Sequence, residues 1–267
     1  MTLIPNVLTI AGSDSGGGAG VQADLKTFSA LETYGASVIT ALTAQNTLAV
    51  AAIHDVPADF VAAQLEAVFA DLHIHAVKIG MLSKVEVIEV VADALERHNR
   101  APLVLDPVMV AKSGDPLLQP DAIAALKARL LPLATVLTPN LPEAGALLDR
   151  PAPRDEAEME AAGRALLELG PQRVLVKGGH LPSGDLVDLL VTPDGVRRYP
   201  TTRVDTGNTH GTGCTLSSAL AALLARGLHP PDAVATATAY VHRAIEQADR
   251  LAVGRGHGPV HHLHPWW

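Results

Sequence analysis

The chain has 267 residues with 20 basic and 28 acidic side chains, a formal net charge of −8. This acidic balance, with aromatic residues at only 3%, argues against a nucleic-acid or membrane-surface partner. The start MTLIPNVLTIAGSD lacks a basic segment before its apolar run, and the chain has one cysteine, so we expect a cytoplasmic protein without signal peptide or membrane span.

Short apolar runs alternate with longer helical patterns from end to end, which is typical of a parallel sheet covered by helices. The first strand is expected at residues 7–11. The helix after it should stop at Gly35, where a glycine favours a C-terminal cap. Its apolar face carries Val21, Leu25, Phe28 and Leu31. Further strands are predicted at 37–42, 76–79, 103–105, 136–138 and 174–176, and helices at 59–71, 85–98, 121–130, 156–168 and after Cys214 and Asp232.

One departure from this alternation lies at residues 186–191 and 196–199, which flank the turn sequence Thr192-Pro193-Asp194-Gly195. We predict an antiparallel hairpin at the edge of the sheet. No repeat, long charge run or Ser/Gly linker divides the chain. Residues 1–267 are therefore expected to form a single α/β domain with a mainly parallel sheet between helical layers.

The most informative segment is Gly211-Thr212-Gly213-Cys214, which runs into the small-residue helix TLSSALAALLARG. A helix start carries free N–H groups and a partial positive charge, and glycines allow a ligand to come close. The segment predicts a phosphate site. The only cysteine of the chain stands in it, and we expect its thiol to lose a proton more easily there.

In open α/β sheets ligands bind beyond the carboxyl ends of the strands. The loop Gly12 to Gly20 follows the first strand but matches neither nucleotide-binding glycine fingerprint, so a tight turn and a ligand loop both remain open. Gln45 follows the second strand, where its amide either pairs with a ring nitrogen and an adjacent amino group or satisfies loop backbone. Met81, after the third strand, is either a pocket wall or core.

Charged residues follow the later strands. Asp106 ends LVLD, where a hydrated magnesium ion would satisfy its carboxylate. Glu143 either caps a helix or adds a second metal contact, and Lys177, which ends RVLVK, suits an anion. Carboxylates, a lysine and a helix start at one edge favour phosphoryl transfer. Serine-hydrolase and zinc chemistry lack their motifs.

These segments resemble a known family. AGSDSGGGAGVQADLKTF, ALTAQNT, KIGML, VLDPVM, TPNLPEA, VLVKGGH and HGTGCTLSSA are similar, in order, to hydroxymethylpyrimidine and phosphomethylpyrimidine kinases of thiamine biosynthesis. That resemblance implies the ribokinase-like three-layer sandwich and the use of ATP and Mg2+. Many relatives in the superfamily have an aspartate as base where this chain has Cys214.

The resemblance also implies two reactions and their residues. The enzyme would phosphorylate 4-amino-5-hydroxymethyl-2-methylpyrimidine and then convert the monophosphate to the pyrophosphate. Cys214 should matter more in the first step, because an alcohol must lose a proton whereas a phosphate is already largely ionised. The implied substrate contacts are Gln45, Gly12, Asp24, Ala19, Met81 and Val108; the nucleotide contacts are Lys177, Asn140 and Thr209; Asp106 and Glu143 serve magnesium; and Gly211, Thr212, Gly213 and Cys214 hold the transferred group.

The resemblance further suggests a homodimer and a flap at Lys112 to Asp115. A close alternative is a pyridoxine or pyridoxal kinase, because the same fold accepts a pyridine ring with a hydroxymethyl group. A non-catalytic pyrimidine-binding regulator is a second alternative, and a nicotinamide oxidoreductase is disfavoured because its fingerprint is absent. The His-rich segment GHGPVHHLHPWW is interpreted as a loose or docking segment rather than a metal site.

Overall fold

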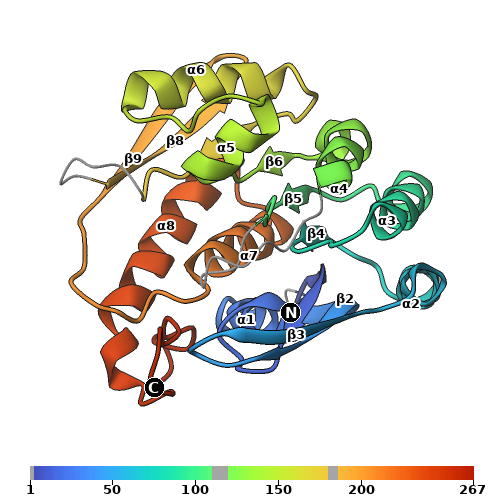
Figure 1. Ribbon diagram of the computed structural model, residues 1–267, viewed down its shortest axis with the longest axis horizontal. Coiled ribbons are helices and arrows are strands. Elements are labelled where there is room, and N and C mark those ends of the chain that lie inside the picture. The colour runs from blue at the N-terminus through green and yellow to red at the C-terminus, as the bar shows by residue number, and fades with distance from the viewer. Residues whose placement is uncertain (1–2, 110–119, 180–185) are drawn as a thin grey trace.

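The fold is built on one twisted sheet, described here from a computed structural model that defines residues 3–109, 120–179 and 186–267. The strands lie in the order β3-β2-β1-β4-β5-β6-β7-β8-β9, with β2 and β3 at one end and β8 and β9 at the other (Figure 1). The strands are β1 (Asn6–Asp14), β2 (Tyr34–Gln45), β3 (Val50–Asp55), β4 (Ala76–Ile79), β5 (Leu103–Leu105), β6 (Val136–Leu137), β7 (Val174–Val176), β8 (Leu186–Thr192) and β9 (Gly195–Thr201).

The strands from β2 to β7 in this order run parallel, while β3, β8 and β9 pair antiparallel at the two ends. The helices are α1 (Gly20–Ala30), α2 (Ala58–Asp71), α3 (Val85–His98), α4 (Pro120–Ala125), α5 (Leu141–Leu148), α6 (Glu156–Leu167), α7 (Thr212–Ala225) and α8 (Pro230–Glu246). Within the described parts of the chain, every helix is too short or too polar to cross a membrane.

Both faces of the parallel strands are covered. Leu8, Val77 and Leu103 pack with α2 to α6 in one apolar cluster. Their immediate neighbours in sequence, such as Val7 and Ala76, pack with α1, α7 and α8 in the other. Successive strand residues point to opposite faces, so continuous apolar runs are required where both faces are buried. The predicted three-layer α/β architecture is confirmed.

The predicted end of the first helix was wrong. α1 ends at Ala30, and the chain turns through Glu32, which has a left-handed φ of 58°. Gly35 instead lies in β2, where an added Cβ would come 2.7 Å from Cδ2 of Leu25. The glycine therefore allows close packing of the strand on the helix, and its role is not to cap the helix.

Two elements were missed and one was interrupted. β3 has the sequence VAAIHD with mostly exposed side chains, so it lacks the apolar alternation that announces a strand. α5 begins inside TPNLPEA, whose Asn140, early proline and Glu143 are signals of a helix start, but no helix was predicted there. The predicted helix 121–130 becomes a π-helical turn at Leu126–Leu130. The segment Lys112 to Asp115 lies outside the described residues.

Candidate active site

Two residues of opposite charge meet beyond the carboxyl ends of β5 and β7. Asp106 follows β5 and Lys177 follows β7, and the parallel arrangement brings both to one edge. Lys177 Nζ donates to Asp106 Oδ1 at 2.9 Å. Burial raises the pKa of the Asp106 carboxyl, but the charges of Lys177 and Lys78 outweigh it and hold the pKa below its usual range. Asp106 is therefore an ionised carboxylate.

Asp106 also connects the sheet to α7. Thr138 Oγ1 lies 3.1 Å from Oδ1, and Ser217 Oγ lies 3.2 Å from Oδ2. Asp106 is only 1% exposed, so these contacts replace water around the charge. Because Ser217 belongs to the first turns of α7, the carboxylate fixes the helix start relative to the strand ends.

Asn140 and Glu143 form a capping box at the start of α5. Asn140 Oδ1 accepts from the Glu143 backbone N–H, and Glu143 Oε2 accepts from the Asn140 N–H, each at 2.8 Å. Lys177 Nζ lies 3.9 Å from Glu143 Oε2. Burial raises the pKa of Glu143 to about 7, although Lys177 opposes this. Glu143 therefore caps the helix, one of its two expected roles, and shares Lys177 with Asp106.

The metal prediction concerns this pair of carboxylates. In residues 3–109, 120–179 and 186–267, no three His, Cys, Asp or Glu side chains gather into a metal site of their own. Mg2+ is usually held by one or two carboxylates while waters and phosphate oxygens complete its shell. Asp106 and Glu143, gathered around one ammonium, fit that donor set.

The glycine turn forms the N-terminus of α7 as predicted. Gly211 is the N-cap with a φ of 80°, and an added Cβ there would collide with the carbonyl oxygen of Gly18. A Cβ on Gly213 would lie 3.4 Å from Lys177 Nζ. Thr212 Oγ1 donates to the carbonyl of Thr209 at 2.7 Å. The helix start therefore faces the charged pair, and its N–H groups and Lys177 converge on one space.

The expectation for the thiol of Cys214 was wrong. Burial raises its pKa to about 11; Lys78 lowers it, while Asp24 and Asp106 raise it. Loss of water and the two neighbouring carboxylates outweigh Lys78 and a hydrogen bond from the Gly20 backbone. The resting side chain is a protonated thiol.

Lys78 was missed by the sequence analysis, and the prediction that Asp24 contacts substrate is corrected. Both side chains have no exposed surface, and Lys78 Nζ lies 2.9 Å from Asp24 Oδ2. Thr9 and Ser218 donate to the same carboxylate, each at 2.6 Å. Asp24 has no exposed surface in this structure, and protein groups occupy its carboxylate, so it supports the site from within the core. A lysine within the apolar strand AVKI was the signal that a buried carboxylate must exist nearby.

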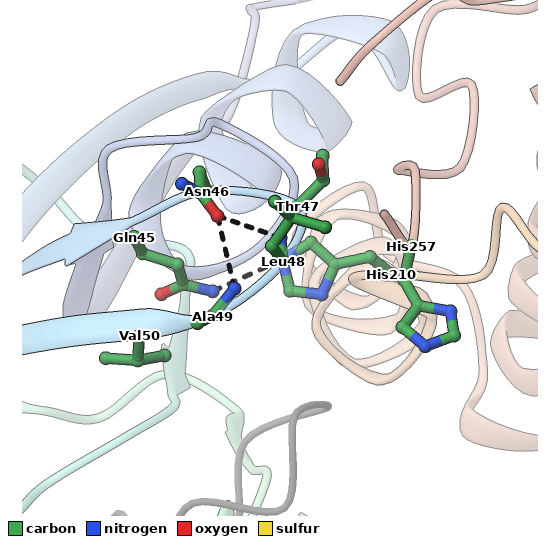
Figure 2. Close-up of a pocket in the computed structure, with 8 residues that line it drawn as sticks. All are labelled: Gln45, Asn46, Thr47, Leu48, Ala49, Val50, His210 and His257. Atoms are coloured by element: carbon green, nitrogen blue, oxygen red, sulfur yellow. Dashed lines mark hydrogen bonds between the residues drawn. The ribbon is translucent and has the colours of Figure 1, made fainter. Parts of the chain in front are cut away.

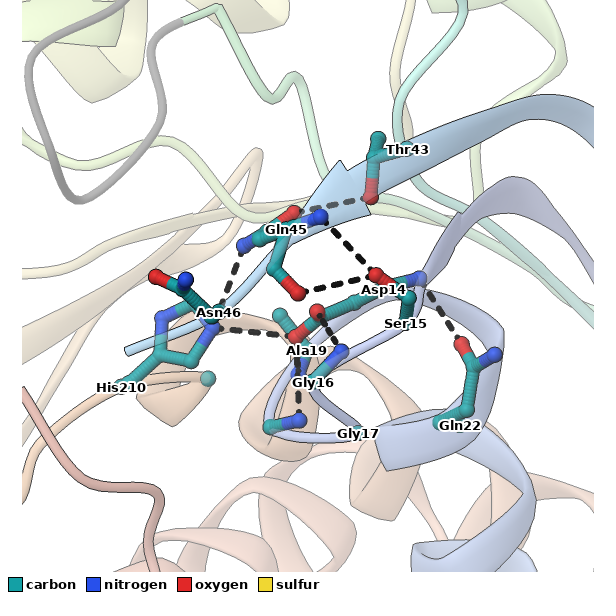
Figure 3. A network of polar contacts seen from close by, with 12 residues as sticks. Asp14, Ser15, Gly16, Gly17, Ala19, Gln22, Thr43, Gln45, Asn46 and His210 are labelled. Carbon is teal, nitrogen blue, oxygen red and sulfur yellow. Dashed lines mark hydrogen bonds and ion pairs between the residues drawn. The ribbon is translucent and has the colours of Figure 1, made fainter. Parts of the chain in front are cut away.

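The glycine loop after β1 wraps around a side chain. The Asp14 carboxylate accepts the N–H groups of Gly16 at 2.8 Å and Ala19 at 2.8 Å, which Figure 3 labels. It also accepts the N–H of Gly18 at 3.0 Å. His210 Nε2 lies 3.1 Å from Oδ2 of the same group. These amides are therefore occupied from within the protein, and the tight-turn interpretation holds for this part of the loop. Asp14 and His210 were both missed.

Gln45 ends β2 and its amide lies between two polar side chains. Oε1 is 3.1 Å from Thr43 Oγ1, and Nε2 is 3.4 Å from His210 Nε2. Figure 2 shows Gln45 and His210 side by side in a small pocket. The pocket is lined by residues 45–50, His210 and His257.

The other predicted substrate contacts lie near the same edge. A Cβ on Gly12 would lie 3.3 Å from Cε of Met81, so the two residues pack together. Ala19 is the N-cap of α1. Val108 is half-buried and follows Asp106 by two residues, with its N–H donating to the Asp106 carbonyl at 2.8 Å.

The His-rich C-terminal segment is docked against this region. His257 N–H donates to the Thr47 carbonyl at 2.9 Å, and Asn208 Oδ1 accepts the Gly258 N–H at 3.1 Å. The segment thereby joins the β2–β3 turn to the loop before α7. This agrees with the docking interpretation of the tail.

Small-molecule kinases of the ribokinase-like superfamily combine this sheet with a glycine turn at the start of a helix opposite the strand ends, and the fold and site assign the chain to that class. More particularly, the chain belongs to the phosphomethylpyrimidine kinase family, whose model matches residues 14–261. The predicted family and its kinase activity are confirmed.

Relatives support this assignment along nearly the whole chain. The hydroxymethylpyrimidine/phosphomethylpyrimidine kinase of Salmonella typhimurium is 57% identical over 262 residues, which cover 98% of both chains. A crystal structure of phosphomethylpyrimidine kinase from Clostridium difficile is 46% identical with a TM-score of 0.81, covering 90% of this chain and 99% of the other. The pyridoxal kinase of Staphylococcus aureus with AMP-PCP and pyridoxal is 36% identical with a TM-score of 0.90, covering 98% of this chain and 94% of the other.

Proposed function

We propose that the protein uses ATP to phosphorylate 4-amino-5-hydroxymethyl-2-methylpyrimidine to its monophosphate and then to its pyrophosphate, for thiamine biosynthesis in the cytoplasm. One observation carries the proposal. His210 stands beside Gln45 and begins the short segment that leads to Cys214, so a ring held at Gln45 has the helix start of α7 within its reach.

The acceptor ring is proposed to bind between Gln45 and the apolar contacts of Gly12, Ala19, Met81 and Val108. A glutamine amide offers one donor and one acceptor, which match a ring nitrogen beside an amino group. Met81 provides a polarisable surface against an aromatic ring. The hydroxymethyl group then points towards Cys214.

The phosphates of ATP are proposed to bind at Lys177, with Asn140 and Thr209 beside them. The N–H groups of Gly211, Thr212 and Gly213 would donate to the oxygens of the phosphoryl group as it moves to the acceptor, while the electron pair of the breaking bond leaves with ADP. Asp106 and Glu143 would hold Mg2+ with its waters, and the ion when bound neutralises phosphate charge. Lys177 already stands between these carboxylates, so it can move to phosphate without leaving the edge.

The thiolate form of Cys214, produced when the thiol loses its proton to solvent, is proposed to receive the proton of the hydroxymethyl group as its oxygen forms a bond to phosphorus. A thiol with a pKa of about 11 is rarely ionised, but its thiolate is a stronger base than one of ordinary pKa. The second acceptor is a phosphate that needs no such base.

Phosphorus NMR of ATP, the pyrimidine alcohol and the enzyme tests the proposal. We expect the monophosphate signal first, followed by the pyrophosphate. Lys177→Met should suppress both, whereas Lys127→Met, which alters a partly exposed ion pair with Asp149, should not. ADP formation without a phosphorylated pyrimidine would refute the substrate, and no ATP consumption would favour a non-catalytic regulator.

Phosphorylation of pyridoxal is the second candidate, because the similarity to the Staphylococcus aureus pyridoxal kinase extends over nearly the entire chain. Specificity constants for the pyrimidine alcohol and for pyridoxal, measured on one preparation, separate the two. The proposal requires the pyrimidine to be preferred.

A homodimer is proposed through the β2–β3 hairpin. Leu42, Leu48 and Ile53 are exposed there, and β3 is an edge of the sheet. A second copy would cover both the apolar side chains and the strand edge. Light scattering should give twice the chain mass, and Ile53→Asp should halve it.

A further inference from the structure

His210 has a fixed position beside the pocket. Its N–H donates to the Gly258 carbonyl at 3.0 Å, and its own carbonyl accepts from Val260 at 3.2 Å. Its ring packs on Gly18, where an added Cβ would collide with Cδ2 of the imidazole. The ring is therefore held by the glycine loop on one side and by the C-terminal segment on the other.

The ring nitrogen that faces Asp14 carries a proton. Burial raises the pKa of Asp14, but the hydrogen bonds from His210, Ala19 and Gly16 lower it by more than burial raises it. The pKa of Asp14 is therefore below its usual value. An ionised carboxylate only accepts hydrogen bonds. His210 Nε2, 3.1 Å away, must then be the donor, whether the ring is neutral or charged.

This proton decides how the Gln45 amide is oriented. A protonated Nε2 has no lone pair in the ring plane, so it cannot accept from the Gln45 nitrogen that lies 3.4 Å away. Rotating the amide by half a turn about its last bond places the oxygen towards His210 and the nitrogen towards Thr43. Thr43 Oγ1 donates to the Ser13 carbonyl at 2.8 Å and keeps a lone pair for the amide N–H. The single proton on Nε2 is then shared between Asp14 at 3.1 Å and the amide oxygen as a bifurcated hydrogen bond, and the amide N–H has Thr43 as its acceptor.

We propose that His210, oriented by Asp14, is a positioning residue that sets substrate specificity by fixing the Gln45 amide with its oxygen on the His210 side and its nitrogen on the Thr43 side. The inference rests on the proposed contact between Gln45 and the pyrimidine. The free edge of the amide then offers an acceptor beside His210 and a donor beside Thr43. It fits a ring nitrogen next to an amino group and rejects an edge with the opposite pattern.

A ligand with the opposite pattern provides the test. In 5-hydroxymethyl-2-methylpyrimidin-4-one, the amino group is replaced by an oxo group and the neighbouring ring nitrogen carries a proton. If the amide is free to rotate, it pairs with either compound. If His210 holds it, the oxo compound meets two mismatched hydrogen bonds.

The ratio of kcat/KM for the amino and oxo compounds is measured in the wild type, His210→Phe and His210→Gln. We expect the ratio to fall by about tenfold to a hundredfold in His210→Phe, the range that one or two mispaired hydrogen bonds produce. His210→Gln, which keeps an N–H donor, should retain the ratio. A general disturbance would slow both substrates and leave the ratio unchanged, so an unchanged ratio in His210→Phe overturns the inference.

Gln45→Ala separates this result from the proposed function. If Gln45→Ala lowers the ratio and His210→Phe does not, only the role of His210 is wrong; if neither lowers it, the proposed Gln45 contact fails as well. A second test observes the wild type directly and uses His210→Gln only to assign its signal. Long-range 1H–15N spectra must show His210 with a proton on Nε2, assigned from the signal missing in His210→Gln, and a bare Nε2 overturns the inference.

Discussion

Lys78 and Asp24 form an ion pair that is closed to solvent, with Nζ 2.9 Å from Oδ2 and 3.0 Å from Oδ1. The lysine belongs to β4 and the carboxylate to α1, and Ser218 of α7 donates to the same carboxylate. Burial lowers the pKa of Lys78, but Asp24 and, to a smaller extent, Cys214 and Asp106 together outweigh burial and raise it to about 12. One charge pair thus joins three elements behind the Cys214 turn.

Removing one member of this pair should destabilise the protein strongly. In Lys78→Met, Asp24 becomes a buried charge without its partner, and we expect the free energy of unfolding to fall by about 3–5 kcal/mol. Urea unfolding measures this. Lys127→Met is the matched control, expected to cost less than about 1 kcal/mol because its ion pair is partly exposed. The double variant Lys78→Met with Asp24→Asn should recover part of the lost free energy of unfolding. Equal losses in Lys78→Met and in Lys127→Met would contradict the predicted role of the buried ion pair.

Cys214→Ala should affect the two proposed phosphorylation steps unequally. The first step is expected to slow by about 10²–10⁴-fold, the usual contribution of a general base, and the second by far less. Separate assays starting from the alcohol and from the monophosphate give the two rates. Cys214→Ser preserves the size of the side chain and controls for packing. Equal losses in both steps would show that the thiol acts on something other than the acceptor proton.

The pH dependence of the first step follows from the raised pKa of Cys214. With that pKa near 11, the thiolate fraction at neutral pH is small and grows with pH. We therefore expect kcat/KM for the alcohol to rise between pH 7 and 9 in the wild type, and the rise to vanish in Cys214→Ala. A flat profile for the wild type would mean that the thiolate is not the reacting form.

Gly211 and Gly207 lie in the same loop before α7, but only Gly211 has no room for a side chain. Gly211→Ala combines a left-handed φ of 80° with a collision against the Gly18 carbonyl, so the start of α7 must shift. We expect both phosphorylation rates to fall by about 10²-fold, a typical result of displacing a catalytic group by 1 Å. Gly207→Ala meets no atom within 4 Å and should change the rates by about twofold or less. Similar rates in the two variants would show that the close approach at Gly211 is unimportant.

His262 should make stability depend on pH. Burial lowers its pKa to about 3, with the charges of Lys26, His261 and His210 adding to the effect. The unfolded chain binds a proton near pH 6.5 and the folded chain does not, so this stability is fully present above pH 6.5 and is lost as pH falls towards 3. At pH 4 the loss is about 3 kcal/mol.

Thermal or urea unfolding of the wild type and of His262→Leu between pH 7 and 4 measures this contribution. The variant should lose less stability on acidification, because the remaining groups titrate alike in both proteins. If the stability of both proteins falls equally with pH, then protonation of His262 does not destabilise the folded state. His264, whose pKa burial also lowers, is less buried, and His264→Leu is the matched control.

Local patterns were sufficient for most of the fold. The strands at 76–79, 103–105 and 174–176 and the hairpin that ends in β9 were predicted because apolar runs and turn residues act over a few neighbours in sequence. The same holds for the glycine turn at Gly211, since a glycine before a helix start is visible in the chain itself. β3 escaped prediction because its pairing with β2, and not its own composition, makes it a strand.

The sequence by itself determined the architecture, the family and the residues that stand at the strand ends, among them Asp106, Lys177 and Cys214. Only the tertiary structure decided which ionisable groups form pairs and which are excluded from water. Lys78 meets a partner 54 positions away, and Asp14 meets His210 across 196 positions. Electrostatic energies depend on distance and on exclusion of water, and neither is written in local sequence. For that reason the thiol predicted to ionise readily is held protonated.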